Sequence, residues 1–287
     1  VLLSNGVVAF LNTRSLAPHG TTPAASAGPP DRLTWSSDGS FIALGFPSGS
    51  VELRRGTDGS FLARVEKLGA AVTTLAVAPD GRSVAAGLSN GHIVLMDASD
   101  APSPKQLSAD PAHPRGVSSL SFSGDGSRLV AGGIDKRVSV WSVSTGALEQ
   151  SWTTSTTDVV QSLAVSRDAS IVAVAGQSPA GGRGIYRNGV HDESLVIPMA
   201  PFDQVRWMSF APHDNAIYIA RSCNDVGVFD LRSGRFDIIC RDLTAMTLAA
   251  APSPDGTRMA MGVGQHLLVA PLGGDTDLLQ APRTLGQ

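Results

Sequence analysis

Short turns of one type recur along the chain at a nearly constant interval, and this repeat restricts the fold more than any other feature of the sequence. Asp-Gly pairs between apolar runs begin at Asp38, Asp80, Asp125 and Asp255, with degenerate versions at Asp168 and Asp214. Successive anchors are 42, 45, 43, 46 and 41 residues apart. Asp-Gly between apolar runs is a strong hairpin signal. The chain therefore reads as a series of similar antiparallel meanders.

Each interval has room for about four short strands, and a period in the low forties with four strands is typical of a β-propeller blade. Six complete units are predicted over residues 31–287, the last of them ending with a strand at Asp277–Gln280. No stretch keeps a helical period over ten or more residues. The predicted fold class is all-β, with four-stranded antiparallel blades.

The amino end is predicted to hold part of a further blade. Within residues 1–12, Ser4–Leu11 repeats the pattern of Ser89–Met96, which places Val1 partway along a second strand and leaves the first strand and most of the second missing. Residues 13–30 are predicted to be a linker loop with at most one short outer strand near Ser15–Ala17. Six units and a fragment favour seven blades in one domain, residues 1–287. We expect this sequence to belong to a longer chain, with the missing strands supplied by upstream residues or by another polypeptide.

The unit from His113 to Trp141 resembles a WD repeat. His113 matches the histidine of the family's Gly-His element, although Ala112 replaces the glycine. Asp135 matches the aspartate in the turn between the second and third strands. Trp141 matches the tryptophan that ends the third strand, and Ser142 stands where the family has aspartate. The resemblance implies a WD-repeat propeller.

The resemblance also implies a polar cluster inside this blade. In the family the histidine, aspartate and tryptophan join with a serine or threonine, and a closed hydrogen-bond network can rigidify a thin sheet. We therefore expect His113, Asp135 and Trp141 to converge. Gly132 and Gly133 occupy the expected hydroxyl position, so the predicted cluster is partial.

Composition excludes several classes of function. The formal net charge is −3, and no segment carries five or more like charges. We therefore expect neither a positively charged surface that binds nucleic acid nor a polybasic patch that binds membranes. No apolar run approaches the ~20 residues of a membrane helix. The two cysteines, Cys223 and Cys240, make no disulfide framework and are expected to be buried thiols. An intracellular protein, cytoplasmic or nuclear, is favoured.

Catalytic motifs are weak. Gly176–Ala180 loosely resembles the nucleophile elbow of serine hydrolases, but the following Gly-Gly-Arg-Gly cannot form the helix that the elbow requires. The six histidines have no metal-ligand spacing. No catalytic residue, cofactor or metal is therefore predicted. A propeller hydrolase using the central channel remains a less favoured alternative, because the expected inner strands offer mostly Val, Leu, Ser, Ala and Thr.

Two adjacent arginines, Arg54 and Arg55, raise a second alternative. The segment Leu53–Gly56 resembles the double-arginine motif of phosphoinositide-binding propellers, and arginine suits phosphate recognition. Here, however, the motif ends a third strand, and neighbouring strand residues point to opposite faces. A solvated edge is the favoured interpretation, and lipid binding is kept as the alternative function.

The favoured function is a non-catalytic scaffold that binds other proteins within a larger assembly. In the WD-repeat family, the turns between second and third strands share a face with the approaches to the inner strands, and this face is most used for partners. The candidate partner-binding residues are Ser178, Arg183, Trp207, Lys136 and Arg137. Ser178 and Arg183 lie in a loop, Gly176–Gly184, which is predicted to hold four extra residues. Trp207 replaces the small residues of other inner strands and could be a binding hot spot or a packing residue.

Overall fold

The structure is a computed structural model. It describes residues 9–11, 18–21, 28–99, 101–108, 110–155, 157, 159–177, 182–198, 203–211, 214–223, 225–240, 247–252, 257–263 and 266–271. The chain divides into two compact units. The first comprises Val1–Thr153 and Arg167–Ala169, and the second comprises Thr154–Ser166 and Ser170–Gln287.

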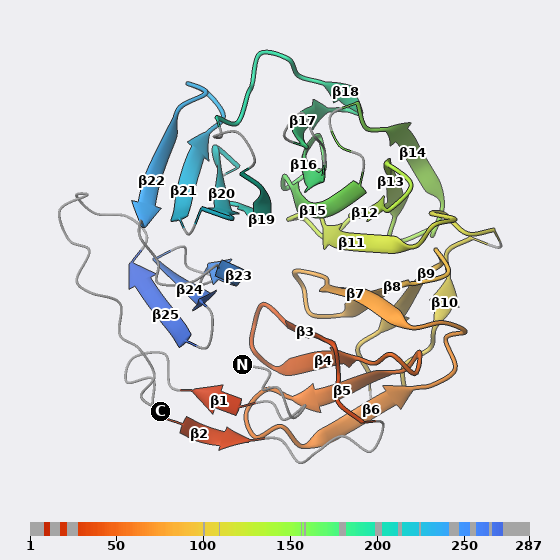
Figure 1. The fold of residues 1–287 in the computed structure, drawn as a ribbon. Helices are drawn as coiled ribbons and strands as arrows, with labels where there is room; N and C mark the ends of the chain where they lie inside the picture. The colour runs from red at the N-terminus through yellow and green to blue at the C-terminus, as the bar shows by residue number, and fades with distance from the viewer. Residues whose placement is uncertain are drawn as a thin grey trace. The chain divides into compact units, whose positions relative to one another are not determined.

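The first unit contains one two-stranded and three four-stranded antiparallel sheets (Figure 1). The short sheet pairs β1 (Ala9–Leu11) with β2 (Pro18–Thr21). The three larger sheets are meanders in which each strand pairs with the next along the chain. They contain β3 (Arg32–Trp35), β4 (Phe41–Gly45), β5 (Val51–Arg55) and β6 (Phe61–Val65); β7 (Val72–Val77), β8 (Ser83–Leu88), β9 (Ile93–Asp97) and β10 (Lys105–Gln106); and β11 (Val117–Phe122), β12 (Arg128–Gly133), β13 (Arg137–Ser142) and β14 (Leu148–Thr153).

The second unit continues the same arrangement with two four-stranded meanders and one sheet of three described strands. Its strands are β15 (Val159–Val165), β16 (Ile171–Gln177), β17 (Arg183–Arg187) and β18 (Val190–His191); β19 (Val205–Phe210), β20 (Ala216–Arg221), β21 (Asp225–Asp230) and β22 (Phe236–Cys240); and β23 (Thr247–Pro252), β24 (Arg258–Val263) and β25 (His266–Pro271). Every described element is a strand, as the sequence predicts, and none is a helix that could cross a membrane.

Neighbouring sheets within each unit share an apolar core. Their middle strands are buried on both faces, which explains the short continuous runs of Val, Ile, Leu and Ala in the sequence. In the first unit, Val117, Leu129 and Trp141 of one sheet pack with Ala85 and Ile93 of the sheet before it. In the second unit, Ile185 packs in one cluster with residues of the β19–β22 sheet. These contacts fix the inner ends of the sheets against one another.

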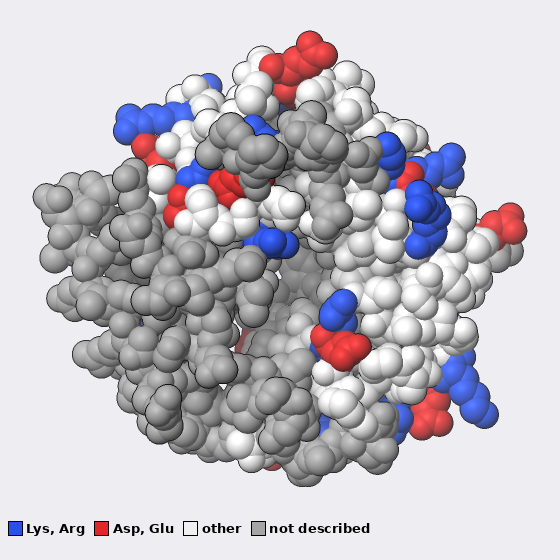
Figure 2. Space-filling view, viewed as in Figure 1, with Lys and Arg blue, Asp and Glu red and all other residues white. Residues whose placement is uncertain are grey.

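Charged side chains are dispersed over the described surface. Several are ion-paired within one sheet or its turns, as in Arg128–Glu149, Arg187–Asp192 and Arg235–Asp237. On the face drawn in Figure 2, blue and red side chains lie in separate small groups rather than in one large field of a single sign. The distribution agrees with the low net charge of the sequence.

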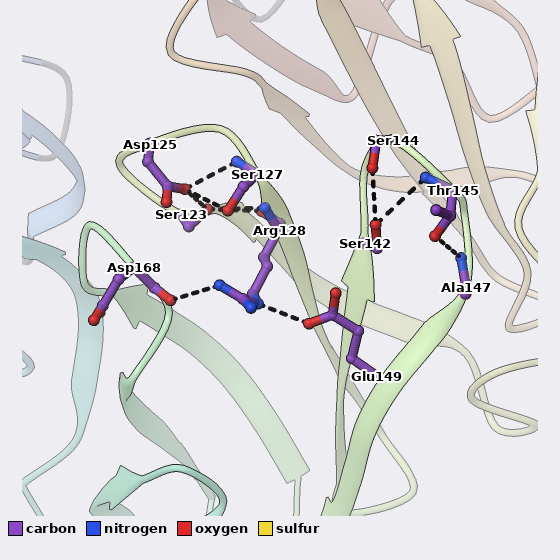
Figure 3. Close-up of polar contacts among 10 residues, drawn as sticks. All are labelled: Ser123, Asp125, Ser127, Arg128, Ser142, Ser144, Thr145, Ala147, Glu149 and Asp168. Atoms are coloured by element: carbon purple, nitrogen blue, oxygen red, sulfur yellow. Dashed lines mark hydrogen bonds and ion pairs between the residues drawn. The ribbon is translucent and has the colours of Figure 1, made fainter.

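In the β11–β14 sheet, the turn between the first and second strands is held by an aspartate and by the serine that lies two residues before that aspartate (Figure 3). Asp125 Oδ1 accepts hydrogen bonds from Ser123 Oγ at 2.6 Å and from Ser127 N at 2.9 Å. The buried Ser123 Oγ in turn accepts the Arg128 amide at 3.0 Å. Serines 36 and 166 accept the equivalent amide in their own sheets. The Asp-Gly signal thus corresponds to a recurring Ser-x-Asp turn.

In one of the two turns that lack an Asp-Gly pair, the residue matched to the aspartate of the other turns stands in a different position. Gly126 has a φ of 72°, and Ala169 and Asp214 adopt the same left-handed conformation with φ of 59° and 54°. Asp214 therefore stands at the glycine position of its turn, one residue after the aspartate position. Its use as the anchor of the fifth unit was wrong by one residue, because aspartate is tolerated in either place.

Two predicted strands fall on residues that the structure does not describe, and the bounds of one predicted loop need correction. The short outer strand expected near Ser15–Ala17 lies outside the described residues, and the strand that pairs with β1 is β2, Pro18–Thr21. The last predicted strand, Asp277–Gln280, also lies outside them. The predicted loop Gly176–Gly184 is partly strand, because β16 continues to Gln177 and β17 begins at Arg183.

The insertion in that loop is smaller than predicted. Val138 pairs with Gly132, and Arg183 pairs with Ala175, so these are equivalent pairs in two sheets. Gly132 and Ala175 are 43 positions apart, whereas Val138 and Arg183 are 45 apart. The loop therefore holds two extra residues, because Ile185 is the counterpart of Val140 and not of Val138.

Candidate functional site

A hydrogen-bonded cluster lies inside the β11–β14 sheet. His113, which is completely buried, lies before β11; its Nδ1 is 3.1 Å from Asp135 Oδ1, and its Nε2 is 2.9 Å from Ser139 Oγ. Trp141 Nε1 donates to the same Ser139 oxygen at 2.9 Å. Since indole N–H can only donate, the Ser139 hydroxyl is free to donate to Nε2, and Nδ1–H then donates to the Asp135 carboxylate. The structure thus brings His113, Asp135 and Trp141 together.

The hydroxyl of this cluster comes from a residue that sequence reasoning missed. It was expected at Gly132 or Gly133 on β12, and its absence there predicted a partial cluster. Ser139 on β13 supplies it instead. A Cβ on Gly133 would lie 2.4 Å from Asp135 Oδ1 and 2.5 Å from His113 Nδ1, so a side chain cannot fit there. The available signal was that Ser139 lies two residues before Trp141 and therefore on the same strand face.

The cluster controls the ionisation of Asp135. Burial acts to raise the pKa of this carboxyl, but the hydrogen bond from His113, the attraction of its ring when protonated and the Arg137 amide together hold the pKa below its usual value. The Arg137 amide also donates to Asp135 Oδ1, at 3.2 Å. The carboxylate therefore closes the turn between β12 and β13 as well as holding the histidine.

The equivalent positions in the β3–β6 sheet contain a different polar pair. Ile42 pairs with Arg54 as Leu129 pairs with Trp141, which makes Arg54 the counterpart of Trp141 and Glu52 the counterpart of Ser139. Arg54 and Glu52 are 5% and 1% exposed and form an ion pair through Nε and Oε1. The expectation of a solvated edge is therefore wrong for Arg54, because an internal carboxylate holds its side chain. Arg55 is exposed.

A second buried polar centre lies at the end of the β19–β22 sheet. Arg221 Nε donates to Asp225 Oδ1 at 2.6 Å and lies 3.6 Å from Asp203 Oδ2. Its guanidinium lies 4.7 Å from the centroid of the Phe236 ring. The hydrogen bond to Asp225 raises the pKa of Arg221. Asp203 also accepts hydrogen bonds from Ser222 Oγ and the Cys223 amide, so this centre ties the approach to β19 to the turn after β20.

Cys223 differs from the buried thiol predicted for it. The residue is exposed, yet its Sγ lies 3.3 Å from Asp203 Oδ2. Desolvation of the thiol, together with hydrogen bonds to Asp203 and Asp225, raises its pKa to about 12. A thiol with such a pKa is a poor nucleophile at neutral pH. The side chain of Cys240 lies outside the described residues.

Backbone hydrogen bonds join the sheet ends of the first unit. The bonds at Leu68 and His113 link the turn between a second and a third strand to the approach of the next sheet's first strand, and those at Ser89 and Ile134 link such a turn to the approach of its own sheet's first strand. They run from Leu68 N to Gly49 O (2.9 Å), Ser89 N to Ala71 O (2.9 Å), His113 N to Gly91 O (3.2 Å) and Ile134 N to Gly116 O (3.1 Å). We call the joined segments 48–49, 67–71, 89–91, 113–116 and 134–137 the turn ledge. Lys136 and Arg137 lie on it, and Arg137 is exposed.

The other candidate partner-binding residues belong to the second unit. Arg183 begins β17, where burial lowers its pKa and its Nε donates to the Ile197 carbonyl at 2.7 Å. Trp207 on β19 is partly buried against a core cluster that includes Tyr218, Met259 and Met261. Ser178 lies outside the described residues. The structure therefore shows Trp207 in a packing position, and its role in partner binding stays a prediction.

Among the described residues, no group of three or more His, Cys, Asp and Glu side chains is arranged to hold a metal ion.

Comparisons with known proteins identify the repeat. Residues 104–142 match the family model described as the WD domain, G-beta repeat. Residues 33–113 match the model of the anaphase-promoting complex subunit 4 WD40 domain. No curated protein matches the sequence. A chain from the crystal structure of a mitotic checkpoint complex is similar in fold, with a TM-score of 0.75 and 20% sequence identity over 94% of this chain and 84% of that chain.

Proposed function

Because the chain belongs to the WD-repeat β-propeller family, we propose that it is a non-catalytic scaffold that binds other proteins as one subunit of a larger assembly. Fold alone does not give function, so the proposal needs a site. The observation that carries it is the turn ledge, where turns and approaches from three neighbouring sheets form one preordered surface. A preordered surface loses little conformational entropy when a partner binds.

The polar groups of the sheets support this interpretation. The side chains capable of strong interactions inside the β3–β6 and β11–β14 sheets are engaged with one another, as Glu52 with Arg54 and His113 with Asp135. Such internal pairs stabilise the sheets and are not offered to a ligand. The exposed side chains of the turns are thus the groups through which a partner can be recognised. Lys136, Arg137, Ser178, Arg183 and Trp207 remain the proposed contacts.

Two similarities agree with a role in an assembly. The second family model is that of a subunit of the anaphase-promoting complex, and the similar solved chain comes from a mitotic checkpoint complex. Neither identifies the partner of this chain. Phosphoinositide binding through Arg54 and Arg55 gains no support, since Arg54 is held by Glu52 inside the sheet.

Affinity purification with mass spectrometry tests the proposal. The full chain should recover a reproducible set of proteins in fixed ratios. Deletion of Ser178–Gly181 should leave folding nearly intact, because surface insertions contribute little to stability, and should reduce recovery of at least one partner. Recovery of the protein alone, under conditions that preserve complexes, would contradict the proposal. A location inside the cell, cytoplasmic or nuclear, stays a prediction that fluorescence microscopy can test.

A further inference from the structure

The turn ledge carries an exposed apolar side chain in a place where turns are usually polar. Ile134 occupies the turn between β12 and β13 and is 38% exposed. Its amide is fixed by the Gly116 carbonyl, and a Cβ on Gly116 would lie 3.6 Å from Ile134 Cδ1. Glycine at this point therefore leaves one flank of the isoleucine uncovered. A single exposed apolar side chain needs no explanation by itself, so the groups around it decide its meaning.

Cationic residues lie on the two ledge segments that the Ile134 amide joins. Arg115 precedes Gly116, and Lys136 and Arg137 follow the turn. Arg115 and Arg137 are exposed, and within the described part of the chain neither forms an ion pair with a carboxylate. In Figure 2, several blue side chains lie over the β11–β14 sheet, with a red one among them.

The carboxylate nearest in sequence does not neutralise these cations at the surface. Asp135 faces inward, with Oδ1 on His113 and on the Arg137 amide, and its Oδ2 is also buried. Elsewhere on or beside the ledge, Glu66 lies 3.3 Å from Arg64, and Asp110 is exposed. The segments 113–116 and 134–137 therefore present two exposed arginines, Arg115 and Arg137, and no outward carboxylate of their own.

This combination of groups favours an acidic peptide over a nucleic acid. Arginine binds carboxylates through paired hydrogen bonds, and an apolar anchor beside it adds burial that a phosphate backbone would not use. Two exposed arginines on a chain of net charge −3 are too few for the electrostatic field of a nucleic-acid site. We propose that the turn ledge binds an extended acidic segment of a partner protein, with an apolar side chain of that segment seated on Ile134. The inference rests on the proposed scaffold function and specifies the chemistry of the partner.

The probe for a direct test is a short fluorescent peptide of Asp and Glu residues with one central Leu. Its binding is measured by anisotropy at low salt and again at about 0.3 M salt. Arg115→Glu/Arg137→Glu should weaken binding by at least about tenfold, as should the higher salt. Ile134→Ala and replacement of the peptide Leu by Ala should each weaken binding, and combining them should add little, because they remove the same contact.

The matched control is Arg55→Glu/Arg82→Glu, which makes the same change in charge. Both arginines are exposed in the first unit, and their turns lie at the opposite sheet ends from the ledge. This variant should bind the peptide as the unchanged protein does. Thermal melts verify that each variant is folded. If Arg115→Glu/Arg137→Glu does not fold, Arg115→Gln/Arg137→Gln, which removes both charges without reversing them, is measured in its place.

Three results would overturn the inference: no saturable binding, equal weakening by the ledge and control variants, or tighter ledge-dependent binding of a single-stranded oligonucleotide. Affinity purification separates this failure from failure of the scaffold function. If the full chain recovers partners and Arg115→Glu/Arg137→Glu recovers all of them equally, the scaffold function stands and the acidic-segment inference falls.

Discussion

Glu52 and Arg54 face each other inside the β3–β6 sheet at the two positions that Ser139 and Trp141 occupy in the β11–β14 sheet. The same positions hold Val94 and Met96 in β9. One backbone site thus accepts an ion pair, a hydroxyl with an indole, or two apolar side chains. What these solutions share is that no charged or polar group is left alone in the interior.

Removing one member of the buried ion pair should be far more damaging than removing both. Arg54→Met alone leaves Glu52 buried and uncompensated, and we expect a loss of about 3–5 kcal/mol in the free energy of unfolding. Glu52→Val/Arg54→Met, which copies the residues of β9, should be close to the unchanged protein. Urea denaturation measures both variants. Equal destabilisation by the single and double variants would show that side-chain shape, and not charge pairing, dominates at this site.

Gly133 should tolerate no side chain while His113 is present. A Cβ there would lie within 2.5 Å of the imidazole, so Gly133→Ala should lower stability by about 1–3 kcal/mol through overpacking. His113→Ala removes the imidazole part of this clash and frees Asp135, whose Oδ1 would lie 2.4 Å from the added methyl group, from its histidine partner. In a double-mutant cycle, Gly133→Ala should therefore cost less in the His113→Ala background than in the unchanged protein. Additive effects would argue against a direct clash.

Asp135 should make stability depend on pH on the acidic side. Its folded pKa lies below the usual aspartate value of 3.8, so the contribution of the carboxylate is complete well above that value and is lost as the pH falls through the folded pKa. At neutral pH, Asp135→Ala should destabilise by about 1–3 kcal/mol, because the histidine loses its acceptor. The difference in melting temperature from the unchanged protein should shrink toward acidic pH. If the difference in melting temperature did not change with pH, the loss of stability would not come from the ionisation of Asp135.

Trp207 offers a test that distinguishes packing from recognition. Trp207→Ala should lower stability by about 3 kcal/mol, since the indole packs with Tyr218 and two methionines. Trp207→Phe keeps most of the apolar volume and should be milder. If Trp207→Phe retains stability but loses a partner recovered by the unchanged protein, the indole also contacts that partner. Denaturation followed by affinity purification provides both readings.

Sequence periodicity predicted the strands well because each Asp-Gly turn has its own local chemistry. The prediction of individual residue positions failed where a residue of another type, or on another strand, fills the same structural role. Asp214 adopts the glycine conformation, and Ser139 supplies the hydroxyl from another strand. The centre at Asp203, Arg221 and Asp225 could not be predicted, because its members come from separate elements and follow no family pattern. Pairing between distant side chains depends on tertiary placement, which local signals do not contain.

The bonds of the turn ledge join only main-chain atoms. Every residue except proline has an amide hydrogen to donate, so this attachment does not depend on which side chain stands at either end. A repeat can therefore exchange its internal residues, as β5, β9 and β13 illustrate, and still remain fastened to its neighbour. Such a chain can accumulate divergent repeats one at a time, with each intermediate sequence retaining the alignment of its sheets.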